Sequence, residues 1–196
     1  MSNPTKSKTN VILFFLIAAI VLCLDLGTKS WVFANYYDTH ADYQAPRYWI
    51  DGVFGIQPST NPGALFGMGA GYHLWFAAIS IVFLMFILVW LFRFGGASSR
   101  FLSIAMGAIS GGILGNFYDR VGLGATPGHP NEIANHVRDW IYFRWEGISI
   151  LDPWPNFNIA DTGLVCGAIL LFIHGMFFNP VPQKDDNKQE LADHGS

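Results

Sequence analysis

The sequence predicts an all-α membrane protein: four transmembrane helices with a small extracytoplasmic β-region between the first and the second helix. Of the 196 residues, 52% are hydrophobic and only 13% are charged, whereas a soluble domain usually carries about 25% charged residues. Four apolar runs also approach the ~20 residues that an α-helix needs to cross a bilayer. The longest connection between two of these runs contains aromatic residues separated by glycines, which is typical of short strands.

The four apolar runs are the expected spans: residues 11–26, 72–92, 101–118 and 159–178. Because irregular backbone in lipid leaves polar groups unsatisfied, a four-helix bundle is the natural architecture. We expect a single transmembrane domain over residues 1–182 and a polar, disordered tail over residues 183–196. Lys6 and Lys8 before the first run also suit a signal peptide, but no small-x-small cleavage site follows. We therefore expect the first run to be a retained helix.

Two long connections, over residues 27–71 and 121–158, separate these spans. The segment Y-W-I-D-G-V-F-G-I-Q in the first connection predicts the short strands. Aromatic side chains in both connections suit the headgroup region of a bilayer: Trp31, Tyr48, Trp49, Trp140, Trp145 and Trp154.

The orientation in the membrane is indicated by the short loop F-R-F-G-G-A-S-S-R between the second and third spans. Its two arginines place the loop, and with it both termini, in the cytoplasm. The two long connections then lie outside. A formal net charge of -3 does not favour a nucleic-acid partner, which requires a basic surface.

Ionisable side chains gather at the outer ends of the first and third spans. Asp25 and Lys29 are four residues apart, and Asn116, Asp119 and Arg120 share one helix face. By themselves, the Asp25–Lys29 and Asp119–Arg120 pairs are typical of interfacial charges that fix the depth of a helix.

The fourth span has a similar polar group at its outer end, where Asn158, Asp161 and Thr162 share a face. Asp139 lies in the connection that precedes this span. An ionised carboxylate at Asp161 costs several kcal/mol inside a membrane unless it is compensated. The start of a helix favours an anion by only about 0.3–1 kcal/mol. We therefore interpret Asp161 as a functional residue.

Two further patterns have simpler interpretations. Small residues recur every four positions along the third span, which predicts close helix packing: Gly107, Gly111 and Gly115. The segment H-P-N-E-I-A-N-H contains three conceivable metal ligands, but their spacing matches no standard zinc motif: His129, Glu132 and His136. We expect neither a metal nor a cofactor.

Three classes of function are compatible with acids at one membrane surface. An enzyme can use them for acid–base chemistry, a carrier or proton relay can bind ions with them, and a structural or lipid-binding module can use ion pairs to pack its helices. Carriers often have repeated halves and helices broken at mid-membrane. The acids lie near one face here, and the sequence has no convincing repeat, so a carrier is less favoured than an enzyme.

Five motifs, in order along the chain, resemble those of the lipoprotein signal peptidases (signal peptidase II). Residues 25–29, D-L-G-T-K, resemble the family's D-x-x-T-K. The other matches are N-P-G-A-L-F-G at 61–67, G-G-I-L-G-N-F-Y-D-R at 111–120, V-R-D-W at 137–140 and F-N-I-A-D at 157–161. They resemble N-x-G-A-x-F, G-G-x-x-G-N-x-x-D-R, V-x-D-F/W and F-N-x-A-D, respectively.

This resemblance implies an aspartyl endopeptidase of the bacterial cytoplasmic (inner) membrane, with its active site at the outer face. The implied substrates are prolipoproteins carrying a diacylglyceryl-cysteine, which are cut just before that cysteine, in contact with membrane lipid. We expect a monomer. The family's catalytic aspartates match Asp139 and Asp161. Its supporting polar residues match Asp25, Lys29, Asn61, Asn116, Asp119, Arg120 and Asn158.

Two departures from the family pattern lie close to Asp139. Arg138 occupies a position that is commonly apolar, and a cation beside Asp139 is expected to lower the pKa of its carboxyl group. The segment A-T-P-G-H-P-N-E-I-A-N before it is longer than usual, which leaves open whether this loop gates access of the substrate.

Overall fold

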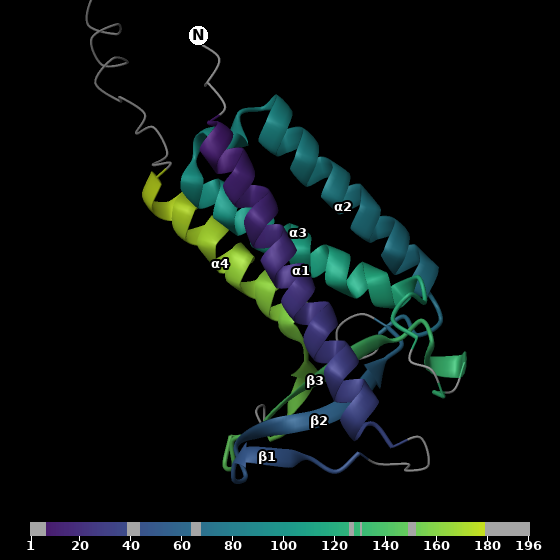
Figure 1. Cartoon of the computed structure of the whole chain (residues 1–196). Helices are drawn as coiled ribbons and strands as arrows, with labels where there is room; N and C mark the ends of the chain where they lie inside the picture. Colours follow the sequence, from purple (N-terminus) through teal and green to yellow (C-terminus); the bar gives the residue numbers. More distant parts are fainter. Residues whose placement is uncertain are drawn as a thin grey trace, which may run out of the picture.

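The computed structural model describes residues 7–38, 44–63, 68–125, 128–129, 131–148 and 152–178, apart from the side chains of Glu132 and Phe178. The predicted tail over residues 183–196 lies outside this part. Four helices form a bundle, and a sheet lies at one end of it (Figure 1). Each helix is long and apolar enough to cross a membrane, as predicted. They are α1 (Lys8–Tyr36), α2 (His73–Arg93), α3 (Arg100–Arg120) and α4 (Ile159–Phe178).

Helix α1 ends at Tyr36 and therefore continues beyond the apolar span expected over residues 11–26. Its 29 residues extend for about 43 Å, whereas the hydrocarbon core is only ~30 Å thick. The helix continues past its first charges because Asp25 and Lys29 are paired inside the protein. Its last turns bury Val32 and Phe33 against the sheet.

The sheet has four antiparallel strands in the order β1-β2-β3-β4. Strands β1 (Arg47–Ile50) and β2 (Phe54–Asn61) confirm the strands predicted between the first two helices. The β-region is larger than predicted, because β3 (Val137–Phe143) and β4 (Trp154–Phe157) come from the connection between α3 and α4. Nearly every residue of β3 is buried, so this strand lacks the alternation by which strands are recognised.

Two apolar clusters stabilise this arrangement. One lies within the bundle at the end away from the sheet and contains Phe14, Ile87, Leu91, Ala97 and Met106. The other joins the outer end of α1 to the sheet and contains Val32, Phe33, Ile56, Trp140 and Ile141. The second cluster fixes the position of β3, and therefore of Asp139, relative to the helices.

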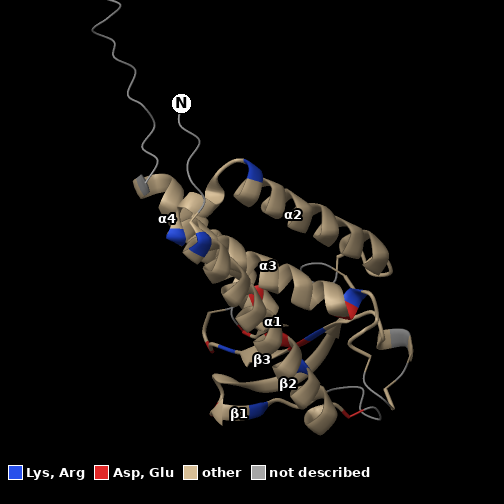
Figure 2. Ribbon diagram, turned by 45° about the horizontal axis from the view of Figure 1, so that its top comes forward, with Lys and Arg blue, Asp and Glu red and all other residues tan. Residues whose placement is uncertain are grey.

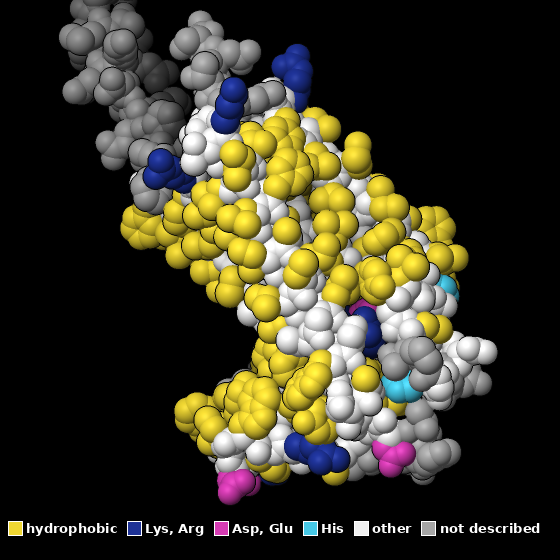
Figure 3. Space-filling view, viewed as in Figure 1, with side chains coloured by type: hydrophobic (Ala, Val, Ile, Leu, Met, Phe, Trp, Pro, Cys, Tyr) yellow, Lys and Arg dark blue, Asp and Glu magenta, His cyan; other side chains and the backbone are white. Residues whose placement is uncertain are grey.

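The surface of the bundle suits a lipid environment. Large apolar side chains cover its outward faces, whereas charged residues lie at the helix ends and where the helices meet the sheet (Figures 2 and 3). This distribution, together with the four long apolar helices, is that of a multi-pass membrane protein.

Helix α3 is packed tightly between α1 and α4, because glycines face both neighbours. A Cβ atom at Gly111 would lie 2.6 Å from the carbonyl oxygen of Ala18 in α1, and one at Gly112 would collide with the carbonyl oxygen of Ala160 in α4. Backbone atoms cannot move aside as a side chain can. These positions therefore require glycine for close approach of the helices.

We predict that Gly111→Ala lowers the stability of the protein by about 1–3 kcal/mol, the usual cost of overpacking a tight contact. The thermal unfolding midpoint in detergent measures this loss. Gly27→Ala in α1 is the matched control, because no atom lies within 4 Å of its added methyl group. This control should raise the midpoint slightly, since alanine favours helix over glycine. An unchanged midpoint for Gly111→Ala would contradict the tight packing of α1 against α3.

Candidate active site

Asp161 is held by a reciprocal cap at the start of α4. The Asn158 side-chain oxygen accepts a hydrogen bond from the Asp161 backbone N–H at 2.8 Å, and the Asp161 carboxylate accepts one from the Asn158 backbone N–H at 3.2 Å. This is the geometry of a capping box, in which two side chains satisfy free N–H groups of the first helical turn. The sequence F-N-I-A-D therefore fixes the carboxylate at the end of the helix.

Asp139 lies in β3, opposite Ser59 of β2. The side-chain amide of Asn158 donates a hydrogen bond of 2.6 Å to Asp139 Oδ1. Asn158 thus contacts both predicted catalytic aspartates, one through its amide nitrogen and the other through its amide oxygen and backbone. The strand and the helix end meet at this one side chain.

Both carboxyl groups line one open cavity of about 1200 Å³ between the sheet and the helices. Its polar lining near the aspartates includes Asn61, Asn116 and Arg120. Its apolar lining comes from helices α3 and α4 and from strand β4: Ile113, Leu164, Val165, Trp154 and Phe157. The cavity is large enough for a peptide segment with an apolar attachment, and it presents acids and apolar surface together.

A buried ion network lies behind this cavity. The Lys29 ammonium contacts Asp25 at 2.7 Å, Asp119 at 3.0 Å and the Asn116 side-chain oxygen at 3.0 Å. The side chains of Lys29, Asp25 and Asp119 are fully buried. Buried charges are tolerated when each is paired and hydrogen-bonded, as they are here.

This network orients the groups that face the cavity. The Asn116 oxygen accepts hydrogen bonds from Lys29 and Asn158, so its NH₂ group faces Asp161 and donates to it at 2.8 Å. Asp25 accepts a hydrogen bond of 2.8 Å from the backbone N–H of Ala160. Helix α4 is therefore tied to α1 and α3 one residue before Asp161.

Asp139 has an unusual protonation equilibrium. Burial, reinforced by the charge of Asp161, raises the pKa of Asp139 to about 8. Lys29 and hydrogen bonds from Asn158 and Asn61 lower this pKa, but less strongly. At neutral pH the Asp139 carboxyl is therefore protonated and can donate a hydrogen bond. Asp161 accepts hydrogen bonds on both of its oxygens, from the side chain of Asn116 and from the backbone of Asn158.

The expectation that Arg138 lowers the pKa of Asp139 is wrong. Successive residues of a strand point to opposite faces, and the Arg138 guanidinium turns away to Asp119, with Nε at 2.9 Å and Nη2 at 2.8 Å from Oδ1. The guanidinium also lies over the ring of Phe33, 5.9 Å from its centroid. Arg138 is thus a buried counterion of the network and not a neighbour of the acid in space.

All nine residues predicted for the site lie at or directly behind the cavity. Arg120 faces the cavity and lies over the ring of Phe76 in α2, 5.5 Å from its centroid. Sequence reasoning missed the wall that β4 contributes, and it missed Arg138 as the partner of Asp119. Assigning V-R-D-W as a strand would have separated Arg138 from Asp139, since residues of a strand alternate in direction.

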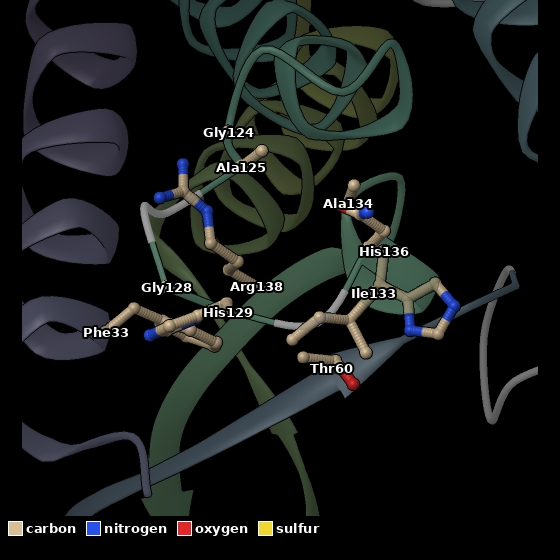
Figure 4. Close-up of a pocket in the computed structure, with 11 residues that line it drawn as sticks. Phe33, Thr60, Gly124, Ala125, Gly128, His129, Ile133, Ala134, His136 and Arg138 are labelled. Carbon is tan, nitrogen blue, oxygen red and sulfur yellow. The ribbon is translucent and has the colours of Figure 1, made fainter. Parts of the chain in front are cut away.

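A smaller cavity of about 250 Å³ is lined by Arg138 and by the segment that precedes β3. His129 and His136, two of the conceivable metal ligands, stand on different sides of it (Figure 4). The His129 ring instead packs on Tyr37, with 4.8 Å between centroids. The Glu132 side chain lies outside the described part of the chain. Among the described side chains, no three of His, Cys, Asp or Glu lie together as metal ligands.

Known proteins resemble this chain over most of its length. A lipoprotein signal peptidase of Rhodopirellula baltica is 47% identical over 145 residues, which are 74% of this chain and 64% of that protein. One of Geobacillus thermodenitrificans is 34% identical over 173 residues, 88% of this chain and 94% of that protein. A solved bacterial membrane enzyme has a TM-score of 0.67 at 26% identity, covering 94% of this chain and 97% of that one.

A family model described as signal peptidase (SPase) II matches residues 17–177. This match includes most of α1 and α4, all of α2, α3 and the four strands, and both aspartates that line the large cavity. The chain therefore belongs to the signal peptidase II family.

Proposed function

We propose that Asp139 and Asp161 activate one water molecule, with which this membrane peptidase cuts signal peptides from prolipoproteins that carry a diacylglyceryl-cysteine. One observation supports the proposal above all: Asn158 joins the two carboxyl groups, and both line the same cavity. Two nearby carboxyl groups that share one proton can supply the base and the acid that amide hydrolysis requires.

Each aspartate has its own role in the proposed reaction. Asp161 takes a proton from water, and the water oxygen attacks the carbonyl carbon of the scissile bond. Asp139 gives its proton to the carbonyl oxygen, which forms a tetrahedral intermediate. When the C–N bond breaks, the leaving nitrogen takes the proton from Asp161, the carbonyl re-forms, and its proton returns to Asp139. Both carboxyl groups end in their starting states, as catalysis requires.

The position of the cavity suits a substrate anchored in lipid. Residues from α3 and α4 supply an apolar wall beside the aspartates, where acyl chains and a signal helix can lie while the peptide bond reaches the water. Because the membrane holds both anchors, it supplies part of the positioning that catalysis needs. Asn61, Asn116 and Arg120 are among the polar residues that line the cavity, where they can contact the peptide or the lipid ester.

We further propose that the sheet lies outside the cytoplasmic membrane and that both termini lie inside the cell. The loop between α2 and α3, flanked by Arg93 and Arg100, is at the end of the bundle opposite the sheet (Figure 1). The positive-inside rule assigns such a loop to the cytoplasm. The proposed active site is complete within one chain, which suits a monomer.

Asp139→Asn and Asp161→Asn should each abolish cleavage of a diacylglyceryl-modified precursor, because an amide can neither take nor give a proton as a carboxyl group does. Mass analysis after incubation with purified protein detects the products. The unaltered chain should cut only the lipidated precursor, just before its cysteine. Asp51→Asn, at an exposed acid in the turn between β1 and β2, is the matched control and should retain full activity.

Near-normal cleavage by either asparagine variant would contradict the proposal that the two aspartates are catalytic. The thermal unfolding midpoint of each variant shows whether a loss of cleavage comes from a loss of folding. The raised pKa of Asp139 means that the folded wild type loses stability as pH rises from about 4, the pKa in the unfolded chain, to about 8. Asp139→Asn lacks this penalty, so at pH 8 its midpoint should equal or exceed that of the wild type.

The rate of cleavage should fall as pH rises through about 8, because the proton on Asp139 that the carbonyl oxygen needs is then lost. The pH dependence of kcat/KM for a lipidated precursor measures this alkaline limb, which reports the protonation of the free enzyme. A profile that stays flat to pH 10 would show that the acid of the reaction is a group other than Asp139.

Arg138→Val should leave the pH–rate profile unchanged, because the guanidinium faces Asp119 and not Asp139. It should nevertheless lower stability by about 3–5 kcal/mol, the usual effect of breaking a buried ion pair. Thermal unfolding and the pH profile test the two parts separately. Arg144→Val is the matched control: its ion pairs with Glu146 and Asp152 are partly exposed, so its loss should hardly change the unfolding midpoint. A shifted alkaline limb for Arg138→Val would show that the guanidinium does influence the pKa of Asp139.

A further inference from the structure

One end of the sheet gathers exposed apolar side chains that the proposed reaction does not use. Strand pairing aligns Ile50 with Phe54, Phe54 with Phe143, and Phe143 with Trp154. The turns between β1 and β2 and between β3 and β4 therefore lie at the same end. We call the exposed residues at this end the aromatic tip: Trp49, Ile50, Trp145, Ile148 and Trp154.

The side chains of the aromatic tip are accessible at the surface of the protein. Trp49 and Ile50 are each 58% exposed, and Trp145 is 54% exposed. The tryptophans are braced from behind: the Trp49 ring lies 5.3 Å from that of Phe54, and the Trp145 ring 6.3 Å from that of Phe143. A rigid apolar patch at the surface marks a contact with a partner or a membrane.

The aromatic tip continues the apolar surfaces already described. Trp154 belongs both to the tip and to the lining of the large cavity, and α4 provides another wall of that cavity. In Figure 3 the apolar face of the helices and the apolar patch at the end of the sheet lie on the same side, with a hollow between them. The tip thus extends the membrane-facing surface beyond the helix ends.

We infer that the aromatic tip docks into the headgroup region of the outer leaflet, beside the helix bundle. Tryptophan suits this depth, because its ring is apolar and its N–H group can bond to water or headgroups. The charges at the same end suit it as well: Arg144 is paired with Asp152, and Asp51 and Glu146 are exposed. These charges limit the insertion to the interface and keep it out of the hydrocarbon core.

Docking of the tip also gives the sheet a role in substrate access. This role rests on the proposed function. With both helices and tip in the membrane, the cavity between them opens to lipid instead of water. A lipidated cysteine then reaches Asp139 and Asp161 without leaving the leaflet. A sheet held in water would require the acyl chains to cross a polar layer.

Spin labels in lipid nanodiscs test the docking directly. In the full chain with Cys23→Ala and Cys166→Ala, single cysteines replace Ile50 or Trp145. Phe83→Cys in α2 serves as the lipid reference, and Asn131→Cys in the segment before β3 as the water reference; both positions are exposed. At the two tip positions, collision with a water-soluble nickel complex should be severalfold rarer than at residue 131, and collision with oxygen more frequent.

Nickel accessibility at residues 50 and 145 equal to that at residue 131 would overturn the inference. So would dipolar broadening between labelled tips, which would show that a second copy of the chain covers them. Neither measurement depends on cleavage, so the docking can fail while the proposed function stands.

Kinetics provide a second readout. Trp49→Ser combined with Ile50→Ser should raise KM for a lipidated precursor severalfold in bilayers, with kcat unchanged, and should have no effect in detergent. Leu123→Ser, at another exposed apolar residue, is the matched control and should change neither constant. An unchanged KM in bilayers would contradict the role in access, whereas absence of cleavage by the unaltered chain would count against the proposed function and not against docking.

Discussion

The rest of the structure depends on the contacts made by the buried ammonium group of Lys29. It joins Asp25 of its own helix to Asp119 and Asn116 of α3, and through Asn116 its influence reaches Asp161. Desolvating one such ion costs several kcal/mol, so each charge in the group is stable only while the others are present. The cations Lys29, Arg120 and Arg138 lie among the acids Asp25, Asp119, Asp139 and Asp161. Burial is the main reason that Asp139 keeps its proton, because the nearby cations offset it only in part.

The two aspartates of the cavity differ because their supports differ. Asp161 lies at the start of a helix and accepts hydrogen bonds from a backbone N–H and from an amide held by Lys29. Asp139 lies in a strand buried on both faces, where the apolar surroundings disfavour charge. The difference between the proposed base, Asp161, and the proposed acid, Asp139, therefore comes from secondary structure and exists before any substrate binds.

The sequence predicted the helices and the members of the site better than their geometry. Apolar length identifies a span by itself, and a charged residue such as Asp161 inside one is conspicuous because membranes exclude charge. The end of α1 was not predictable in this way, since nothing local shows that Lys29 would find its partners 87 and 90 residues further along the chain, at Asn116 and Asp119. Strand β3 was missed for a related reason: its burial on both faces comes from tertiary contacts, which removes the periodic pattern. The wrong role expected for Arg138 followed directly from that omission.

The pairing of β2 with β3 places two neighbouring residues, Arg138 and Asp139, on opposite faces of the sheet. Arg138 stabilises the protein on one face of the strand, and Asp139 faces the cavity on the other. A slip of one residue in this pairing would exchange them, placing a guanidinium in the cavity and a carboxyl group against Asp119. A single-residue insertion within Val137–Phe143 would have the same effect on every residue that follows it in the strand, so the cavity depends on this register as much as on the residues themselves.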